Sequence, residues 1–186
     1  MSKAVMLSIR PKWVEKISNG EKTIEVRKTR PKLDTPFKCY IYCTQSGVAL
    51  GAWGKHGKVI GEFTCDRIDW ITHIGYTGIP NLVETRICDA ATMRTSPTGA
   101  LLNAACLTPE MLNDYLAGGD GYGWHISDLV IYDEPKELTE FHTWKKCKSC
   151  SKSGYESTAC IYDENCMVPV AITKAPQSWC YVEEDT

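Results

Sequence analysis

The pattern of apolar and polar positions predicts a strand followed at once by a helix at the start of the chain. Residues 4–9 read AVMLSI, an alternating stretch with one aliphatic face. Pro11 suits the first position of a helix, and Gly20 suits the left-handed residue that ends one. Between them apolar residues recur at helical spacing, on the face that carries Trp13 and Ile17.

The next predicted strand, residues 23–27, carries apolar and polar side chains on opposite faces. Its sequence is TIEVR, and a period of two sends the two aliphatic residues into a core. The same period places Thr23, Glu25 and Arg27 together on the other face. This gathers charges of both signs beside the polar side of the first strand.

The rest of the chain predicts more strands, one more helix and one long segment without a clear period. Thr108 and Pro109 form a good helix start, and the glycines at 118 and 119 end that helix. Residues 75–107 are expected to form a long loop with a possible short helix. Further strands are expected at residues 38–44, 58–74, 122–132 and 177–183. About six strands and two peripheral helices, without regular alternation, predict an α+β fold built on a small, mainly antiparallel barrel.

Length and composition fit one globular domain. The chain has 186 residues, of which 43% are hydrophobic and 24% are charged, so it is expected to form a single domain over residues 1–186. Residues 143–175 look like a Cys-rich insertion in it. No apolar run approaches the roughly 20 residues that span a bilayer, and the first residues lack the apolar core of a signal peptide. We therefore expect a cytoplasmic protein without a membrane partner.

Charge is distributed unevenly along the chain. The whole chain carries a formal charge of −2, but residues 1–32 hold nine Lys or Arg and three Glu, a local charge of +6. The remainder carries −8. A basic segment on an acidic body fits a protein that meets phosphate at one surface. The alternative is a solvated helix face followed by a lysine-rich turn.

A short motif connects this basic segment with a known domain. Gly20, Lys22, Glu25 and Arg27 follow the spacing G-x-K-x-x-E-x-R, after a strand and a helix that begins SIRPxW. With a late strand that contains WHISD and a closing PQSWCY, the sequence resembles the ASCH domain of the PUA-like superfamily. The resemblance is to small ASCH proteins of gut bacteria and their phages.

The resemblance implies a small β-barrel with a cleft beside the first helix that binds RNA or a nucleobase. We therefore expect a binding module for RNA, a nucleotide or a modified nucleoside. A carboxylate there could accept hydrogen bonds from a base edge, while cations contact phosphate. Two alternatives stay open: an exposed strand face with weak ion pairs, and core packing for the tryptophans. No protein partner is evident. The predicted ligand-binding residues are Ser8, Arg10, Lys22, Glu25, Arg27, Trp124, Trp179 and Tyr181.

A small hydrolase is the second functional hypothesis. The resemblance implies this too, because some ASCH relatives are amidohydrolases that act on acylated cytidines, and others are described as ribonucleases. In the amidohydrolase pattern a Thr nucleophile stands three residues after the motif lysine, where this chain has Glu25. Hydrolysis would then need Glu25 as a general base on water and Lys22 as an electrostatic stabiliser.

Ten cysteines are many for a protein of reducing cytosol, and four of them are spaced like metal ligands. A C-x2-C pair lets two thiolates bind one ion, and a second pair completes a tetrahedral Zn²⁺ site. His142 and Cys180 are alternative ligands, because the second pair is loosely spaced. Unpaired thiols and a redox pair are the other interpretations. The predicted structural zinc ligands are Cys147, Cys150, Cys160 and Cys166.

Overall fold

The computed structural model describes residues 3–45, 56–75, 83–89, 95–96, 98–146 and 167–183. Its helices are α1 (Pro11–Ser18), α2 (Thr98–Ala105), α3 (Pro109–Leu116) and the single 3-10 turn η1 (Leu138–Glu140). Its strands are β1 (Lys3–Ile9), β2 (Ile24–Arg27), β3 (Phe37–Cys43), β4 (Val59–Cys65), β5 (Ile68–Gly75), β6 (Val83–Asp89), β7 (Thr95–Ser96), β8 (Gly121–His125), β9 (Ser127–Lys136), β10 (His142–Lys146), β11 (Met167–Ala171) and β12 (Trp179–Glu183). The described part of the chain is therefore α+β, as the sequence predicts.

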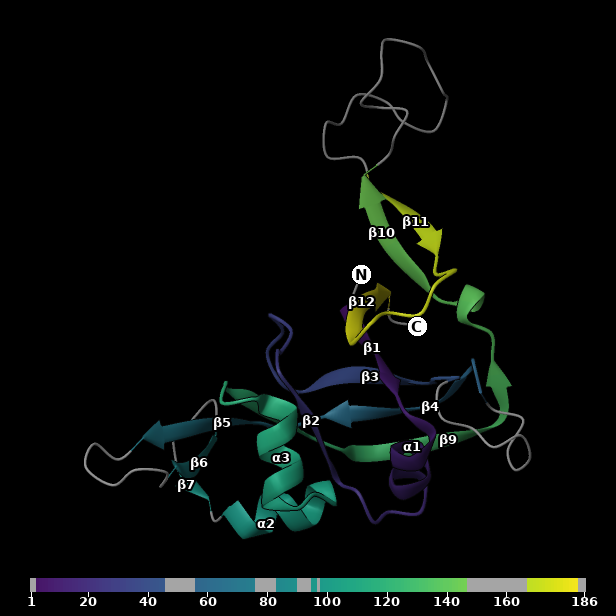
Figure 1. Ribbon diagram of the computed structural model, residues 1–186. Helices are drawn as coiled ribbons and strands as arrows, with labels where there is room; N and C mark the ends of the chain where they lie inside the picture. Colours follow the sequence, from purple (N-terminus) through teal and green to yellow (C-terminus); the bar gives the residue numbers. More distant parts are fainter. Residues whose placement is uncertain are drawn as a thin grey trace, which may run out of the picture.

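Two five-stranded sheets and one hairpin make up the described β-structure (Figure 1). The first sheet has the order β12-β1-β3-β4-β9, and the second has the order β2-β8-β5-β6-β7. Strands β1 and β3 pair in parallel, while every other described pairing is antiparallel. Since β12 and β9 stand at opposite edges of the first sheet, the described strands form no closed barrel. The expected barrel is corrected to two open sheets.

The strand, helix and strand at the start of the chain are confirmed. Helix α1 begins at Pro11, and Gly20 adopts the left-handed φ of 79° that its role after the helix requires. Helix α3 is also confirmed: the Thr108 side chain accepts a hydrogen bond from the backbone N–H of Met111 at 3.2 Å. Both helices begin with a proline at a position that needs no amide hydrogen.

Two predicted long strands are each divided between the sheets. The segment expected over 58–74 breaks at residues 66–67 into β4 and β5, and the segment expected over 122–132 breaks at Ile126 into β8 and β9. Strand β4 pairs with β9 in the first sheet, and β5 pairs with β8 in the second. The four strands thus form one antiparallel ribbon that bends from one sheet into the other. Such bends, with register shifts along β4 and β9, are how strands turn a corner between sheets.

The segment expected to be a long loop contains regular structure. Strands β6 and β7 and helix α2 lie within residues 75–107, and β6 pairs with β5 along the second sheet. The expectation of a loop over this whole segment is therefore wrong, and the helix count rises from two to three. The possible short helix corresponds to α2. Its Leu101 and Ala105 are buried against β2 and β5.

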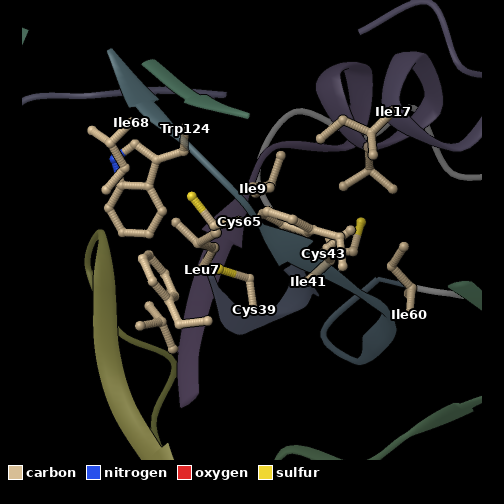
Figure 2. Close-up of a cluster of buried hydrophobic side chains, with 14 residues drawn as sticks. Leu7, Ile9, Ile17, Cys39, Ile41, Cys43, Ile60, Cys65, Ile68 and Trp124 are labelled. Carbon is tan, nitrogen blue, oxygen red and sulfur yellow. The ribbon is translucent and has the colours of Figure 1, made fainter. Parts of the chain in front are cut away.

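The main core lies where β1, β3 and β4 of the first sheet meet α1 and the strands β5 and β8 of the second sheet (Figure 2). Leu7, Ile41 and Ile60 lie in it with Trp124 of the second sheet. A second cluster covers the other face of the first sheet, and a third joins the second sheet to α2 and α3. Because both faces of β1 are buried, the first strand is fixed on all sides. That rigidity positions the polar side chains at its end.

Strands β10 and β11 form a hairpin that extends away from the two sheets (Figure 1). Their pairing runs from His142 and Ala171 to Lys146 and Met167. The predicted insertion over 143–175 therefore begins within β10 and ends four residues after β11, and residues 147–166 lie outside the described residues. Among the helices that the structure describes, none has the length and apolar character that a membrane span needs.

Candidate nucleotide-binding cleft

A cleft of about 1310 Å³ lies between α1, β2 and α3. Strand β2 contributes its floor, with Glu25 and Arg27. Residues at the end of β1 and the start of α1 line one side, and α3 lines another. Residues 175–178, just before β12, complete the lining. Five of the predicted ligand-binding residues line this cleft together: Ser8, Arg10, Lys22, Glu25 and Arg27.

Glu25 is held at the floor between two cations. Its Oε2 atom lies 3.3 Å from Lys22 Nζ, and its Oε1 atom lies 3.0 Å from Arg27 Nη2. The three residues are 6%, 3% and 7% exposed, respectively. The polar face of β2 is therefore not the solvated strand face that the sequence left open. Each carboxylate oxygen can accept more than one hydrogen bond, so Glu25 retains acceptor capacity beside the cleft.

Lys22 uses all of its donors inside the protein. Its ammonium group donates to the carbonyl oxygens of Ile24 and Ala105, both at 2.8 Å, besides its ion pair with Glu25. An ammonium group has three hydrogens, so this set of acceptors matches it completely. Lys22 thereby connects β2 with the end of α2. Its position favours a role in holding Glu25 rather than contact with a ligand phosphate.

Arg27 connects β2 with β1 and with the segment before β12. Its Nη2 atom donates to the Ser8 carbonyl at 2.8 Å, and its Nη1 atom lies 3.4 Å from the carbonyl and from the hydroxyl of Ser178. The Ser8 hydroxyl donates to the Pro176 carbonyl at 2.6 Å. Ser8 and Arg27 therefore fix the wall of the cleft at residues 175–178.

The lining of the cleft has an excess of positive charge. Five cationic side chains and two carboxylates line it, which gives a formal charge of +3. Of the five cations, Arg10, Lys12 and Lys28 form no ion pair with a described carboxylate. These three are the cations that remain to contact an anion. Arg10 is the only one of them that the sequence interpretation selected.

Aromatic side chains contact the lysines at two places on the wall. Lys12 Nζ and Lys22 Nζ lie 4.5 Å and 5.1 Å from the ring centroid of Trp13, and Lys28 Nζ lies 5.5 Å from that of Tyr115. Trp13 is half-buried against the main core, whereas Tyr115 is 41% exposed. Burial raises the pKa of the Tyr115 hydroxyl, while the guanidinium group of Arg27 opposes that rise. Tyr115 thus presents exposed side-chain surface at the cleft, next to Lys28.

The three aromatic residues selected from the sequence do not line the cleft. Trp124 pairs with Glu25 across β2 and β8, and so shares its face of the sheet. Its ring is nevertheless fully buried, because Phe37 and Trp179 cover it at centroid distances of 5.8 Å and 6.1 Å. Tyr181 packs edge-on against Trp179. The core-packing alternative therefore holds for Trp124, and the structure does not bring these rings to the cleft.

Sequence reasoning missed the contribution of α3. Met111, Asp114 and Tyr115 line the cleft, while Leu112 and Leu116 form the buried face of the same helix. A signal was available, because Met111 and Tyr115 are large apolar residues spaced by four and offset from the buried pair. An apolar pair on the flank of an amphipathic helix indicates a second contact surface.

The structure leaves the zinc site untested. All four predicted ligands lie outside the described residues, and the described residues contain no group of three metal-ligating side chains. Of the two alternative ligands, His142 begins β10. Cys180 packs against the second core cluster, and burial raises the pKa of its thiol.

A second polar cluster lies outside the cleft lining. Asp69 is buried, and its Oδ2 atom lies 2.8 Å from His125 Nε2, while its Oδ1 atom lies 3.4 Å from Arg67 Nε. The His125 imidazole is half-buried and hydrogen-bonded to Asp69, and it does not line the cleft.

Comparison with known proteins gives a likeness in fold. No protein-family model matches the chain, and no curated protein matches it. Its structural neighbours include ASCH domain proteins. The crystal structure of ASCH from Zymomonas mobilis matches with a TM-score of 0.48 and 18% identity, and the match covers 73% of each chain. A mutant of that protein matches with a TM-score of 0.48 and 18% identity over 74% of this chain and 77% of its own. The domain that the sequence motif resembles thus occurs among the structural neighbours, and this degree of likeness gives no ligand or activity for the present chain.

Proposed function

We propose that the cleft binds single-stranded RNA or a nucleotide. The observation that carries the proposal is a buried carboxylate, Glu25, on the floor of a cleft with a charge of +3. A carboxylate accepts hydrogen bonds from the amino groups of cytosine, adenine and guanine. Arg10, Lys12 and Lys28 are available for phosphate, and Tyr115 offers a stacking surface.

Binding measurements on matched variants test this proposal. Lys12→Ala and Lys28→Ala should each weaken the binding of a fluorescent single-stranded RNA. Each should also flatten the dependence of affinity on salt, because a variant that neutralises fewer phosphates releases fewer counterions when it binds. Lys16→Ala is the matched control, because Lys16 pairs with Glu21 and does not line the cleft. Equal binding by all three variants would contradict the proposal.

Glu25→Gln separates base recognition from phosphate contact. The amide keeps the size of the side chain but presents a donor in place of one acceptor, so base preference should change more than the salt dependence of binding. A preference among homopolymeric RNAs that is identical in wild type and variant would exclude Glu25 from base recognition.

The hydrolase hypothesis is tested by the same variant. A general base contributes about 10²- to 10⁴-fold to rate, so Glu25→Gln would abolish turnover of RNA or an acylated cytidine at unchanged affinity. The geometry favours binding over this alternative, because Lys22 uses its hydrogens within the protein. Turnover by the wild type that is lost in Glu25→Gln would replace the binding-only proposal.

A further inference from the structure

Two large apolar side chains lie exposed on the α3 wall of the cleft. Met111 is 38% exposed and Tyr115 is 41% exposed, and both line the cleft. Positions spaced by four lie next to each other on a helix, so the two side chains form one continuous strip. Leu112 and Leu116 already bury the other face of α3. The strip is therefore not needed for packing the helix onto the sheet.

Charge differs between the two sides of the cleft. The side at the start of α1 carries Arg10 and Lys12, whereas helix α3 itself contributes one carboxylate, Asp114, and no cation to the described lining. Cations attract a phosphate and carboxylates repel it, so a terminal phosphate would lie toward α1 and the helix α3 would face a base.

Lys28 lies between the floor and this apolar strip. It follows Arg27 directly in the chain, and its Nζ atom lies 5.5 Å from the ring centroid of Tyr115. A phosphate held by Lys28 would thus stand between a base at Glu25 and a base at Tyr115. The cleft volume of about 1310 Å³ also exceeds the roughly 300–1,000 Å³ of pockets for a single small ligand.

From these contacts we infer that the cleft holds two consecutive nucleotides, with the second base stacked on Tyr115 and Met111. The inference rests on the proposed function and makes it more specific. Its ligand is a dinucleotide unit of a single strand rather than a free mononucleotide. The first base donates hydrogen bonds to Glu25, and Lys28 contacts the linking phosphate. The second base stacks on the exposed strip of α3 and is not selected by hydrogen bonds.

Three ligands with the same first nucleotide test the inference by titration calorimetry. They are the 5′-mononucleotide, the 5′-phosphorylated dinucleotide, and a 5′-phosphorylated dinucleotide whose second residue lacks its base. The dinucleotides are measured with the second residue on the 3′ side of the first and, separately, on its 5′ side. Because the last two carry equal charge, their difference reports stacking alone. Stacking of one base on an aromatic side chain corresponds to about 5- to 150-fold in affinity, and the wild type should prefer the complete dinucleotide by a factor in that range.

Variants on α3 assign the effect to the strip. Tyr115→Ala should weaken binding of the complete dinucleotide about 5- to 150-fold more than binding of the mononucleotide, and so abolish the preference for the second base, while Tyr115→Phe should keep the preference. Asn113→Ala is the matched control, because Asn113 is exposed on the same helix outside the cleft lining, and it should also keep the preference. Circular dichroism confirms that each variant is folded. Equal affinity of the wild type for the complete and the base-free dinucleotide would overturn the inference, as would an equal loss of mononucleotide and dinucleotide binding in Tyr115→Ala. If neither these ligands nor longer RNA binds, the proposed function itself fails.

Discussion

Lys22 shows, at the scale of one residue, that a charged side chain at a binding cleft can serve to hold the fold together rather than to contact a ligand. The motif spacing placed it beside Glu25, and the structure confirms that proximity at 3.3 Å. What the spacing could not show is that Ala105, at the end of α2, supplies one of its acceptors. That contact joins residues 83 positions apart, and no local pattern encodes it.

Replacement of Lys22 by methionine should destabilise the protein strongly. The substitution leaves the buried carbonyl oxygens of Ile24 and Ala105 without a donor, while Glu25 keeps its ion pair with Arg27, and each buried polar group left unsatisfied costs about 1–3 kcal/mol. Urea unfolding monitored by tryptophan fluorescence measures the loss. Lys16→Met is the matched control, because the ion pair of Lys16 with Glu21 is solvent-exposed and should contribute little. Equal unfolding midpoints for the two variants would show that Lys22 is not a structural residue.

The polar face of β2 shows how far the sequence could go at a binding residue. A period of two correctly placed Glu25 and Arg27 on one face, because alternation is a property of the strand itself. Their burial is not a property of the strand, since the Arg27 guanidinium group contacts Ser178, which comes from near the far end of the chain. Trp124 lies opposite Glu25 on the same face of the sheet, but the rings of Phe37 and Trp179 cover it from other strands, and a single sequence does not show such partners.

At the scale of elements, the sequence predicted correctly the helices whose first and last residues mark their ends. Helices α1 and α3 begin with proline and are followed by glycine, so their bounds could be read locally. The breaks between β4 and β5 and between β8 and β9 carry neither glycine nor proline. These strands change sheets because of the partners on either side. A single sequence therefore predicts one long strand in each case.

Gly61 lies in β4 at a place where β9 packs closely against it. A Cβ atom added to it would lie 2.4 Å from the Val130 carbonyl oxygen and 3.1 Å from Ile131 Cδ1. Gly61→Ala must therefore push β9 away from β4, and an overpacked core site of this kind costs about 1–3 kcal/mol. The free energy of unfolding from urea titration measures the effect.

Gly99→Ala provides the opposite case for that experiment. Gly99 lies in α2, where an added Cβ atom would meet nothing within 4 Å. Alanine is the better helix former, so the variant should be as stable as the wild type or slightly more stable. A Gly61→Ala protein that matches Gly99→Ala in stability would contradict the close packing of β4 on β9.

At the scale of the whole molecule, we propose a zinc site as a separate unit attached to the two sheets. The four cysteines of the C-x2-C-x9-C-x5-C pattern fall between β10 and β11, which pair with each other up to Lys146 and Met167. Purified protein should contain about one zinc per chain, and Cys150→Ser should lose it while the sheets stay folded. Elemental analysis and circular dichroism measure the two effects, and Cys106→Ser, a cysteine beside Glu21, is the control. Metal-free protein after purification without chelators would refute the zinc site.

The bent ribbon has a consequence for how the molecule unfolds. Strand β4 continues into β5, and β8 continues into β9. The β4–β9 pair of the first sheet is therefore continuous with the β5–β8 pair of the second. Fraying of the second sheet would expose Trp124, which lies in the core beside Leu7 and Ile41 of the first. Neither sheet can therefore melt while the other keeps its packing. The two sheets should behave as one cooperative unit, with the floor of the cleft as stable as the core itself.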